Sequence, residues 1–189
     1  VWSKQFGTSG KDFAKDVALD SSGNIYLTGF VTGSFDGNTS KRGRDILVLK
    51  LDTNGNKVWS KTFGIANDTA FDLTLDSAEN IYLTGRVNES FDGNTHQGDN
   101  DIIILKLDNN GNKKWSKQFG TSGADEARGV NLDSLGNIYL TGFVAGSFYG
   151  NTHKGYEDIF ALKLDVNGNK VWSKQFGTAE GDKGLSLKV

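Results

Sequence analysis

Four tryptophans recur at an almost fixed interval along the chain. They are Trp2, Trp59, Trp115 and Trp172, spaced 57, 56 and 57 residues apart, and each begins a Trp-Ser-Lys tripeptide. Self-similarity at a fixed period of this order is typical of repeat architectures, in which each repeat is one supersecondary unit that packs on its neighbours. The 189 residues therefore predict three tandem units, and the fold of one unit decides the fold of the chain.

Two other segments keep the same period. An Asn-Ile-Tyr-Leu-Thr-Gly segment occurs three times, at 24–29, 80–85 and 137–142. A block that ends in Leu-Lys-Leu-Asp begins at Asp45, Asp101 and Asp158. The spacing differs by one residue only after the Phe-Gly pair that follows each tryptophan, which predicts a loop at that point because loops tolerate insertions.

Each unit contains four runs with strand character. In the first unit they are Asp16–Asp20, Asn24–Val31, Asp45–Asp52 and Lys57–Phe63, rich in β-branched and aromatic residues. Asn-Gly turns such as Asn54-Gly55 indicate hairpins, because both residues tolerate positive φ. Each unit is therefore predicted to be a four-stranded antiparallel meander. One meander cannot bury both of its faces, and radial stacking of such sheets predicts an all-β fold, a β-propeller.

The unit boundaries leave extra strands at both ends. Residues 1–7 are predicted to be the outer strand of a preceding blade, and residues 177–189 to contain the first strand of a further blade. The three complete blades are expected at 8–63, 64–119 and 120–176. Three blades do not close a ring, since propellers have about four to eight. We therefore expect further blades of a longer chain or self-association of copies, and Val1 is not a translation start because the chain has no Met.

The repeated segments resemble a bacterial β-propeller repeat, the SBBP repeat. The resemblance rests on Gly-Thr-Ser-Gly-Lys-Asp-Phe-Ala at 7–14, on Val-Ala-Leu-Asp-Ser-Ser-Gly-Asn-Ile-Tyr-Leu-Thr-Gly at 17–29, and on Asp-Ile-Leu-Val-Leu-Lys-Leu-Asp at 45–52. One departure is Ser-Phe-Asp-Gly at 34–37, where the family often has Asp-Phe-Pro. The resemblance implies a secreted or cell-surface bacterial protein and no common catalytic activity.

Composition excludes several classes of function. The 21 basic and 23 acidic residues give a net charge of −2, so we expect no nucleic-acid ligand and no insertion into a membrane. The chain has no Cys, and it contains no P-loop, no dinucleotide fingerprint and no Gly-x-Ser-x-Gly elbow. We therefore expect a protein that is not an enzyme.

Repeated acidic residues are the candidates for a metal site. Two sets share the face that carries the long loops and the loops between units; they are Asp12, Asp68, Asp125 and Asp182, and Asp45, Asp101 and Asp158. Each carboxylate either accepts backbone N–H bonds and fixes its own loop, or shares a Ca²⁺ ion with loop carbonyls. No other cofactor is expected. The Asp-Thr-Asn-Gly-Asn run at 52–56 mimics the start of an EF-hand loop, but a hairpin turn explains it, because Lys57 stands where the loop glycine belongs.

The long loops between the second and third strands are the candidate recognition face. They span Thr32–Arg44, Asn88–Asn100 and Ala145–Glu157, and they begin alike before their tips diverge in charge. Either the tips drift without constraint, or they bind a ligand. The candidate ligand-binding residues are Lys41, Arg42, Arg44, His96, Asp99, His153, Tyr156 and Glu157. The two histidines are interpreted as solvated, and Trp59 and its equivalents as core between blades.

Three functions remain open. The first is a non-catalytic extracellular or cell-surface repeat module that serves as a structural, assembly or protein-binding scaffold. The second is a lectin-like propeller that binds glycans. The third is part of a propeller hydrolase or lyase whose active blades lie outside this sequence.

Overall fold

The fold is three four-stranded sheets stacked side by side, as predicted. A computed structural model describes residues 1–189, and each sheet is an antiparallel meander with its strands in sequence order. Blade 1 contains β1 (Phe13–Leu19), β2 (Ile25–Thr32), β3 (Arg44–Leu51) and β4 (Lys57–Phe63). Blade 2 contains β5 (Thr69–Leu75), β6 (Ile81–Val87), β7 (Asp101–Leu107) and β8 (Lys113–Phe119). Blade 3 contains β9 (Glu126–Leu132), β10 (Ile138–Val144), β11 (Asp158–Leu164) and β12 (Lys170–Phe176).

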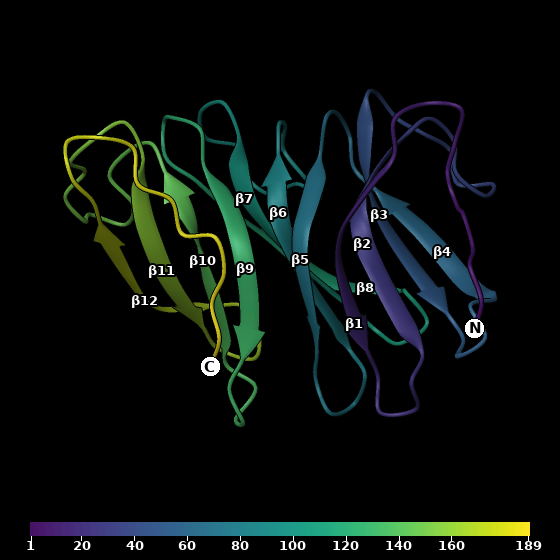
Figure 1. Cartoon of the computed structure of the whole chain (residues 1–189). Coiled ribbons are helices and arrows are strands. Elements are labelled where there is room, and N and C mark those ends of the chain that lie inside the picture. Colours follow the sequence, from purple (N-terminus) through teal and green to yellow (C-terminus); the bar gives the residue numbers. More distant parts are fainter.

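The blades stack through their first two strands, and the ring is open. Contacts between blades join β1 to β5 and β5 to β9, so the first strands form the inner wall of the array (Figure 1). The long loops and the loops between blades lie at one end of the strands, and the short hairpins lie at the other (Figure 1). No helix that could cross a lipid bilayer is present.

The two larger hydrophobic cores lie between blades, and a smaller one lies within blade 1. One core joins Tyr26 and Ile46 of blade 1 to Leu73 and Leu83 of blade 2, and a second joins blade 2 to blade 3 in the same way. Three equivalent inner-strand residues show what a neighbouring blade covers: Leu73 is 4% exposed and Val130 is 3% exposed, whereas Val17 of blade 1 is 56% exposed. Each blade therefore depends on the next for its apolar burial.

A β-bulge interrupts the inner strand of every blade. In blade 1 the pairing passes from Ala14 to Asp16, so Lys15 has no partner on β2. Because pairing continues through the bulge, β1 begins at Phe13, three residues before the predicted start. The same bulge leaves Phe71 and Arg128 unpaired in blades 2 and 3. A bulge turns one side chain out of the regular alternation of the strand.

The tryptophans of the outer strands of blades 1 and 2 pack on the following blade. The Trp59 ring lies against Gly111 in the β7–β8 turn, and its Nε1 donates a hydrogen bond of 3.1 Å to the carbonyl oxygen of Asn109. Trp115 lies against Gly168 of blade 3 in the same manner. These contacts confirm that the tryptophans form core between blades.

The two chain ends differ from the prediction, because neither forms a strand. Residues 1–7 still occupy the place of a preceding outer strand, since Trp2 packs on Gly55 as Trp59 packs on Gly111. Near the other end, Gly184 donates one backbone bond of 3.1 Å to Gly142, and residues 186–187 lie against Gly129. Without adjacent strands of their own blades, neither segment has the ladder of hydrogen bonds that defines a strand.

Candidate binding surfaces

The acidic residues between blades hold their own loops. Asp68 accepts hydrogen bonds from the backbone N–H groups of Ile65 (2.6 Å) and Asn88 (3.1 Å), which ties the loop between blades to the end of β6. Asp12, Asp125 and Asp182 accept the equivalent loop N–H groups. These four carboxylates therefore accept hydrogen bonds from the backbone of their own loops, as expected if their role is to fix the loop conformation.

The acidic residues at the start of each third strand are buried. Asp101 is 0% exposed, and its Oδ2 accepts bonds from the backbone of Gln97 (2.8 Å) and from the Gln118 amide (2.7 Å). Its Oδ1 has no hydrogen-bond partner and packs against Gly120. Asp158 repeats this arrangement with Gln175 and Gly177. Asp45 keeps the partnerless Oδ1 beside Gly64 but has no glutamine partner. Each of these glycines has no Cβ atom, and the Asp Oδ1 lies close to where that atom would be.

Burial, with the charge of a neighbouring carboxylate, raises the pKa of several of these carboxyl groups. Burial raises the pKa of Asp125 to about 6, and the charge of Asp101 adds to the effect. Burial also raises the pKa of Asp68, to which the charge of Asp45 contributes, and it raises the pKa of Asp101. No three His, Asp or Glu side chains gather in a metal-binding group. The Ca²⁺ site therefore stays a prediction, one that needs backbone carbonyls as additional ligands.

The hairpin acids are explained as turn residues. Asp52 Oδ1 accepts the backbone N–H groups of Asn54 (2.9 Å) and Asn56 (2.8 Å), and Oδ2 accepts the Asn56 amide. The backbone N–H of Asn56 lowers the pKa of Asp52, because it stabilises the charged form. This geometry confirms the hairpin interpretation of the run that resembles an EF-hand loop.

The two histidines, interpreted as solvated, are only partly exposed and contact an acidic residue. The His96 side chain is 24% exposed, and its Nδ1 lies 3.2 Å from Asp101 Oδ2 and 3.3 Å from the Gln118 amide. His153 repeats these contacts with Asp158 and Gln175. The loop folds back over its own strand, which buries the ring against the acid. Blade 1 has Ser40 and Thr62 at these two positions, so histidine and glutamine occur together in two units and are absent together in the third.

The remaining loop candidates do not converge on one site. Arg42 pairs with Glu89 of the next blade at 3.0 Å, and Glu157 pairs with Lys183 at 2.8 Å. Arg44 stacks on the Phe30 ring. The other three candidates are exposed at separate loop tips; they are Lys41, Asp99 and Tyr156. The tips alone therefore form no pocket.

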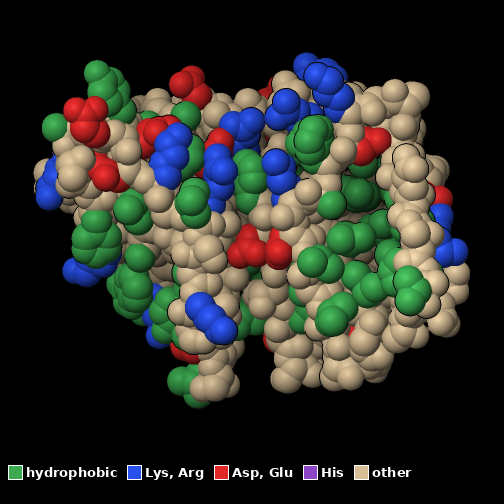
Figure 2. All heavy atoms as spheres, in the orientation of Figure 1, with side chains coloured by type: hydrophobic (Ala, Val, Ile, Leu, Met, Phe, Trp, Pro, Cys, Tyr) green, Lys and Arg blue, Asp and Glu red, His purple; other side chains and the backbone are tan.

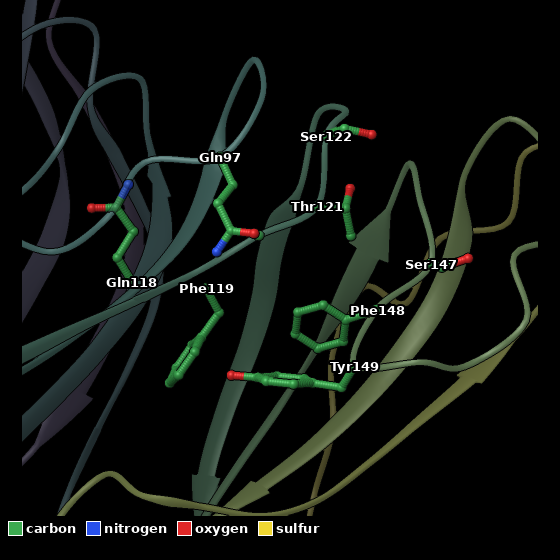
Figure 3. Close-up of a pocket in the computed structure, with 9 residues that line it drawn as sticks. Gln97, Gln118, Phe119, Thr121, Ser122, Ser147, Phe148 and Tyr149 are labelled. Carbon is green, nitrogen blue, oxygen red and sulfur yellow. The ribbon is translucent and has the colours of Figure 1, made fainter.

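The largest cavity is a cleft between blades 2 and 3, with a volume of about 480 Å³. Figure 3 shows Phe119 from blade 2 facing Phe148 and Tyr149 from the β10–β11 loop, with Gln97 and Thr121 above them. None of the lining residues is charged; they are Gln97, Gln118, Phe119, Gly120, Thr121, Ser122, Ser147, Phe148 and Tyr149. The cleft therefore offers amides, hydroxyls and aromatic rings to a neutral polar ligand.

Tyr149 makes this cleft unlike the equivalent clefts. Blades 1 and 2 have Asp36 and Asp92 at its position, where each carboxylate binds the outer strand of its own blade, through Lys57 and Ser60 of β4 or through Lys113 and Ser116 of β8. Tyr149 adopts a φ of 50°, a left-handed conformation that suits Asp far better than an aromatic residue. Backbone strain of this kind is typical of functional positions.

Sequence reasoning missed the cleft residues and the bulge residues. Tyr149 was visible as a change from Asp in an otherwise repeated Ser-Phe-Asp-Gly-Asn-Thr segment. Lys15, Phe71 and Arg128 follow an alanine that all three inner strands share, and their side chains differ in kind. An alignment of the three units, position by position, would have identified both.

Two inner-strand carboxyl groups form a close pair, which gives a testable pH dependence. Asp16 accepts the backbone N–H of Leu73 (3.0 Å), and Asp72 accepts that of Val130 (2.7 Å). Burial, together with the neighbouring Asp16 carboxyl group, raises the pKa of Asp72 to about 7. Between pH 4 and 7 the folded state thus holds a proton that the unfolded state releases, so stability falls as pH rises through this window.

We expect Asp72→Asn to remove this decline. At pH 8 the variant should be more stable than the parent by about 1–2 kcal/mol, a value reduced for solvent screening of a partly buried group. Urea unfolding at pH 5 and pH 8 measures the change. Asp52→Asn is the control with the opposite sign, because hydrogen bonds lower the pKa of Asp52. An unchanged pH slope in Asp72→Asn would contradict the prediction.

Comparison with known proteins supports the architecture. Residues 1–29 and 114–142 match the family model described as SBBP, a β-propeller repeat. A curated relative, the regulatory protein FlaEY of Caulobacter vibrioides, is 26% identical over 190 residues. That match covers 88% of this chain and 20% of the relative, so the chain corresponds to about one fifth of the length of that protein.

Proposed function

We propose that this array of SBBP-type β-propeller repeats is a non-catalytic, extracellular or cell-surface module that binds ligands through the side chains that differ between its blades. The observation that carries the proposal is that scaffold residues are repeated between blades while certain surface residues are not. The repeated Asp residues hold backbone in every blade, whereas Gln97 and Tyr149 of the cleft and the three bulge residues differ from their equivalents in the other blades. Repeated scaffold residues that carry a variable surface are typical of binding modules.

The apolar end faces support a role in assembly. Val17 and Leu19 are 56% and 64% exposed on blade 1, and Trp172 and Phe176 are 38% and 57% exposed on blade 3. Their equivalents between blades are covered by the neighbouring blade, as the 4% exposure of Leu73 shows. We propose that further blades of a longer chain, or a second copy, cover these faces.

The cleft between blades 2 and 3 favours a lectin-like function as the second candidate. Its uncharged lining matches the hydroxyl groups and apolar ring faces of a neutral saccharide. A charged ligand would find no opposite charge among these residues. The equivalent cleft beside residues 5–7 contains the ion pair of Asp36 and Lys57, so the neutral lining is a feature of one junction.

Tyr149→Asp tests the binding function separately from the fold. The new carboxylate can pair with Lys170, as Asp36 pairs with Lys57, and it suits the left-handed backbone. We expect stability to be unchanged or raised by about 1 kcal/mol, and binding to neutral glycans on an array to fall about tenfold. Tyr156→Asp is the matched control, because Tyr156 is 78% exposed and lies outside the cleft.

Two outcomes would contradict these proposals. The absence of any glycan signal above background would remove the lectin-like function and leave the scaffold proposal. Hydrolysis or elimination of a bound glycan, abolished by replacement of one acidic residue, would overturn the non-catalytic proposal itself.

A further inference from the structure

A second surface lies on the inner wall of the array, away from the cleft. The bulge residue of blade 3, Arg128, extends to blade 2, where its guanidinium carbon lies 4.4 Å from the centre of the Phe71 ring. Phe71 is itself the bulge residue of blade 2. Side chains that the bulges turn out of the strands therefore meet one another along the inner wall.

Arg128 and Arg86 together hold one carboxylate. Glu126 is 5% exposed, and its Oε2 accepts bonds from Arg128 Nε (2.8 Å) and Nη2 (2.6 Å), while its Oε1 accepts Arg86 Nη1 (2.6 Å). Two guanidinium groups and one carboxylate leave a net positive charge. The arrangement also shows which chemical group this surface fits, because a planar guanidinium is preorganised for a carboxylate.

Blade 1 has the cations of this arrangement without the acid. The Arg44 guanidinium lies 4.6 Å from the centre of the Phe30 ring, and Lys15 Nζ lies 5.5 Å from that of Phe13. The two rings are 5.2 Å apart, and Phe13 is 51% exposed. Neither Lys15 nor Arg44 forms an ion pair. Two cations held against aromatic rings thus face solvent beside an apolar surface.

These residues form one patch, which we name the inner-face basic patch. It consists of Lys15, Arg44, Arg86, Arg128 and Lys183, and Lys183 Nζ lies 4.4 Å from the Phe143 ring centre. Figure 2 shows basic side chains gathered across the upper half of the face that presents β1, β5 and β9, with hydrophobic side chains between them. Glu126 and Glu157 pair with three of these cations, and Figure 2 also shows acidic side chains at the centre of the face, so the unpaired positive charge of the patch is concentrated at Lys15 and Arg44.

We propose that the inner-face basic patch binds a polysaccharide of uronic acids. The carboxylates would meet Arg44 and Lys15, as Glu126 meets Arg128 within the chain. In the 189-residue chain Phe13 is exposed, and its ring would contact the C–H face of a sugar ring. A preceding blade that covered Val17 would cover Phe13 as well, so this contact belongs to a chain whose blade 1 face is uncovered. An acidic peptide supplies carboxylates without that apolar face. A stiff polymer with one charge on every sugar also loses little conformational entropy when it binds cations fixed on successive blades.

Binding of an oligogalacturonate to the full 189-residue chain, measured by isothermal titration calorimetry, tests the proposal. The variant Lys15→Gln/Arg44→Gln should bind roughly tenfold more weakly, and affinity should fall as salt is raised. The control Lys114→Gln/Lys174→Gln removes the same charge from the outer strands β8 and β12 and should change affinity less than about twofold. Equal unfolding midpoints would show that both variants remain folded.

Comparator ligands separate the alternatives. Poly-glutamate should bind more weakly than oligogalacturonate, and dextran should not bind. Equal binding of poly-glutamate would overturn the saccharide assignment, and so would the absence of binding to oligogalacturonate. An equal loss in the outer-strand control would overturn the location. Tyr149→Asp should leave this affinity unchanged, so the failure of the cleft proposal and the failure of this one are distinguishable.

Discussion

Gly85→Ala is expected to cost the chain about 3 kcal/mol or more of its free energy of unfolding, because the substitution forces two strand backbones apart. Gly85 lies on β6 opposite the bulge of β5, where a methyl group would overlap the carbonyl oxygen of Thr69. A backbone atom in a paired strand cannot rotate away as a side chain can. The effect should be measured by urea unfolding followed by tryptophan fluorescence.

Gly93→Ala is the matched control for that substitution. Gly93 has a φ of 76° and no atom near the position of an added methyl group, so only backbone strain opposes the change. We expect a cost of about 1 kcal/mol. Equal costs at the two positions would show that the close approach to Thr69 does not decide the choice of glycine at Gly85. Gly29 and Gly142 face carbonyl oxygens in the same way, so the result extends to every blade.

The second large effect is expected for Trp59→Ala, at about 3–4 kcal/mol. The substitution removes the packing on Gly111, the hydrogen bond to Asn109, and an edge-to-face contact with Tyr26 at 6.2 Å. Because the first two contacts reach into blade 2, the variant should also reduce the cooperativity between blades. Thermal and urea unfolding would measure both effects.

Trp172→Ala isolates the part of this effect that belongs to the junction. Trp172 makes the same edge-to-face contact with Tyr139 at 6.2 Å, but it is 38% exposed and has no following blade in the structure. We expect a cost of about 1 kcal/mol for this contact alone. If both substitutions cost the same, stacking on the neighbouring turn contributes nothing, and the account of the tryptophan period is wrong.

The overall architecture was predictable because its signals are local and repeated. Each hairpin has its own Asn-Gly or Gly-Asn turn, each strand has β-branched residues, and the tryptophan spacing counts the blades. The ends of the chain were predicted less well. Residues 1–7 have the sequence of an outer strand, but a strand also needs a partner, and partners are a property of tertiary structure.

The candidate sites were less predictable for physical reasons. The backbone contacts of the acidic residues were among the two alternatives that the sequence offered, because carboxylates in loops commonly accept nearby N–H groups. The burial of His96 depends on a loop that folds back on Gln118, which is 22 residues away. The cleft at Tyr149 depends on Phe119 from the preceding blade. Contacts between distant residues leave no periodic pattern, so single-sequence reasoning places them on loops and does not bring them together.

The bulge at Lys15, Phe71 and Arg128 also bears on how such an array evolves. In a regular strand, every residue belongs to one face, and a change on the packed face disturbs the core. A bulge residue is released from that alternation, so strand pairing constrains its identity little. Arg128 is constrained in another way, because it binds the buried carboxylate of Glu126. Duplication of a blade then copies the scaffold together with one position that strand pairing does not fix. New specificity can arise there without disturbing the sheet, and three such positions on adjacent blades form a natural site for directed evolution.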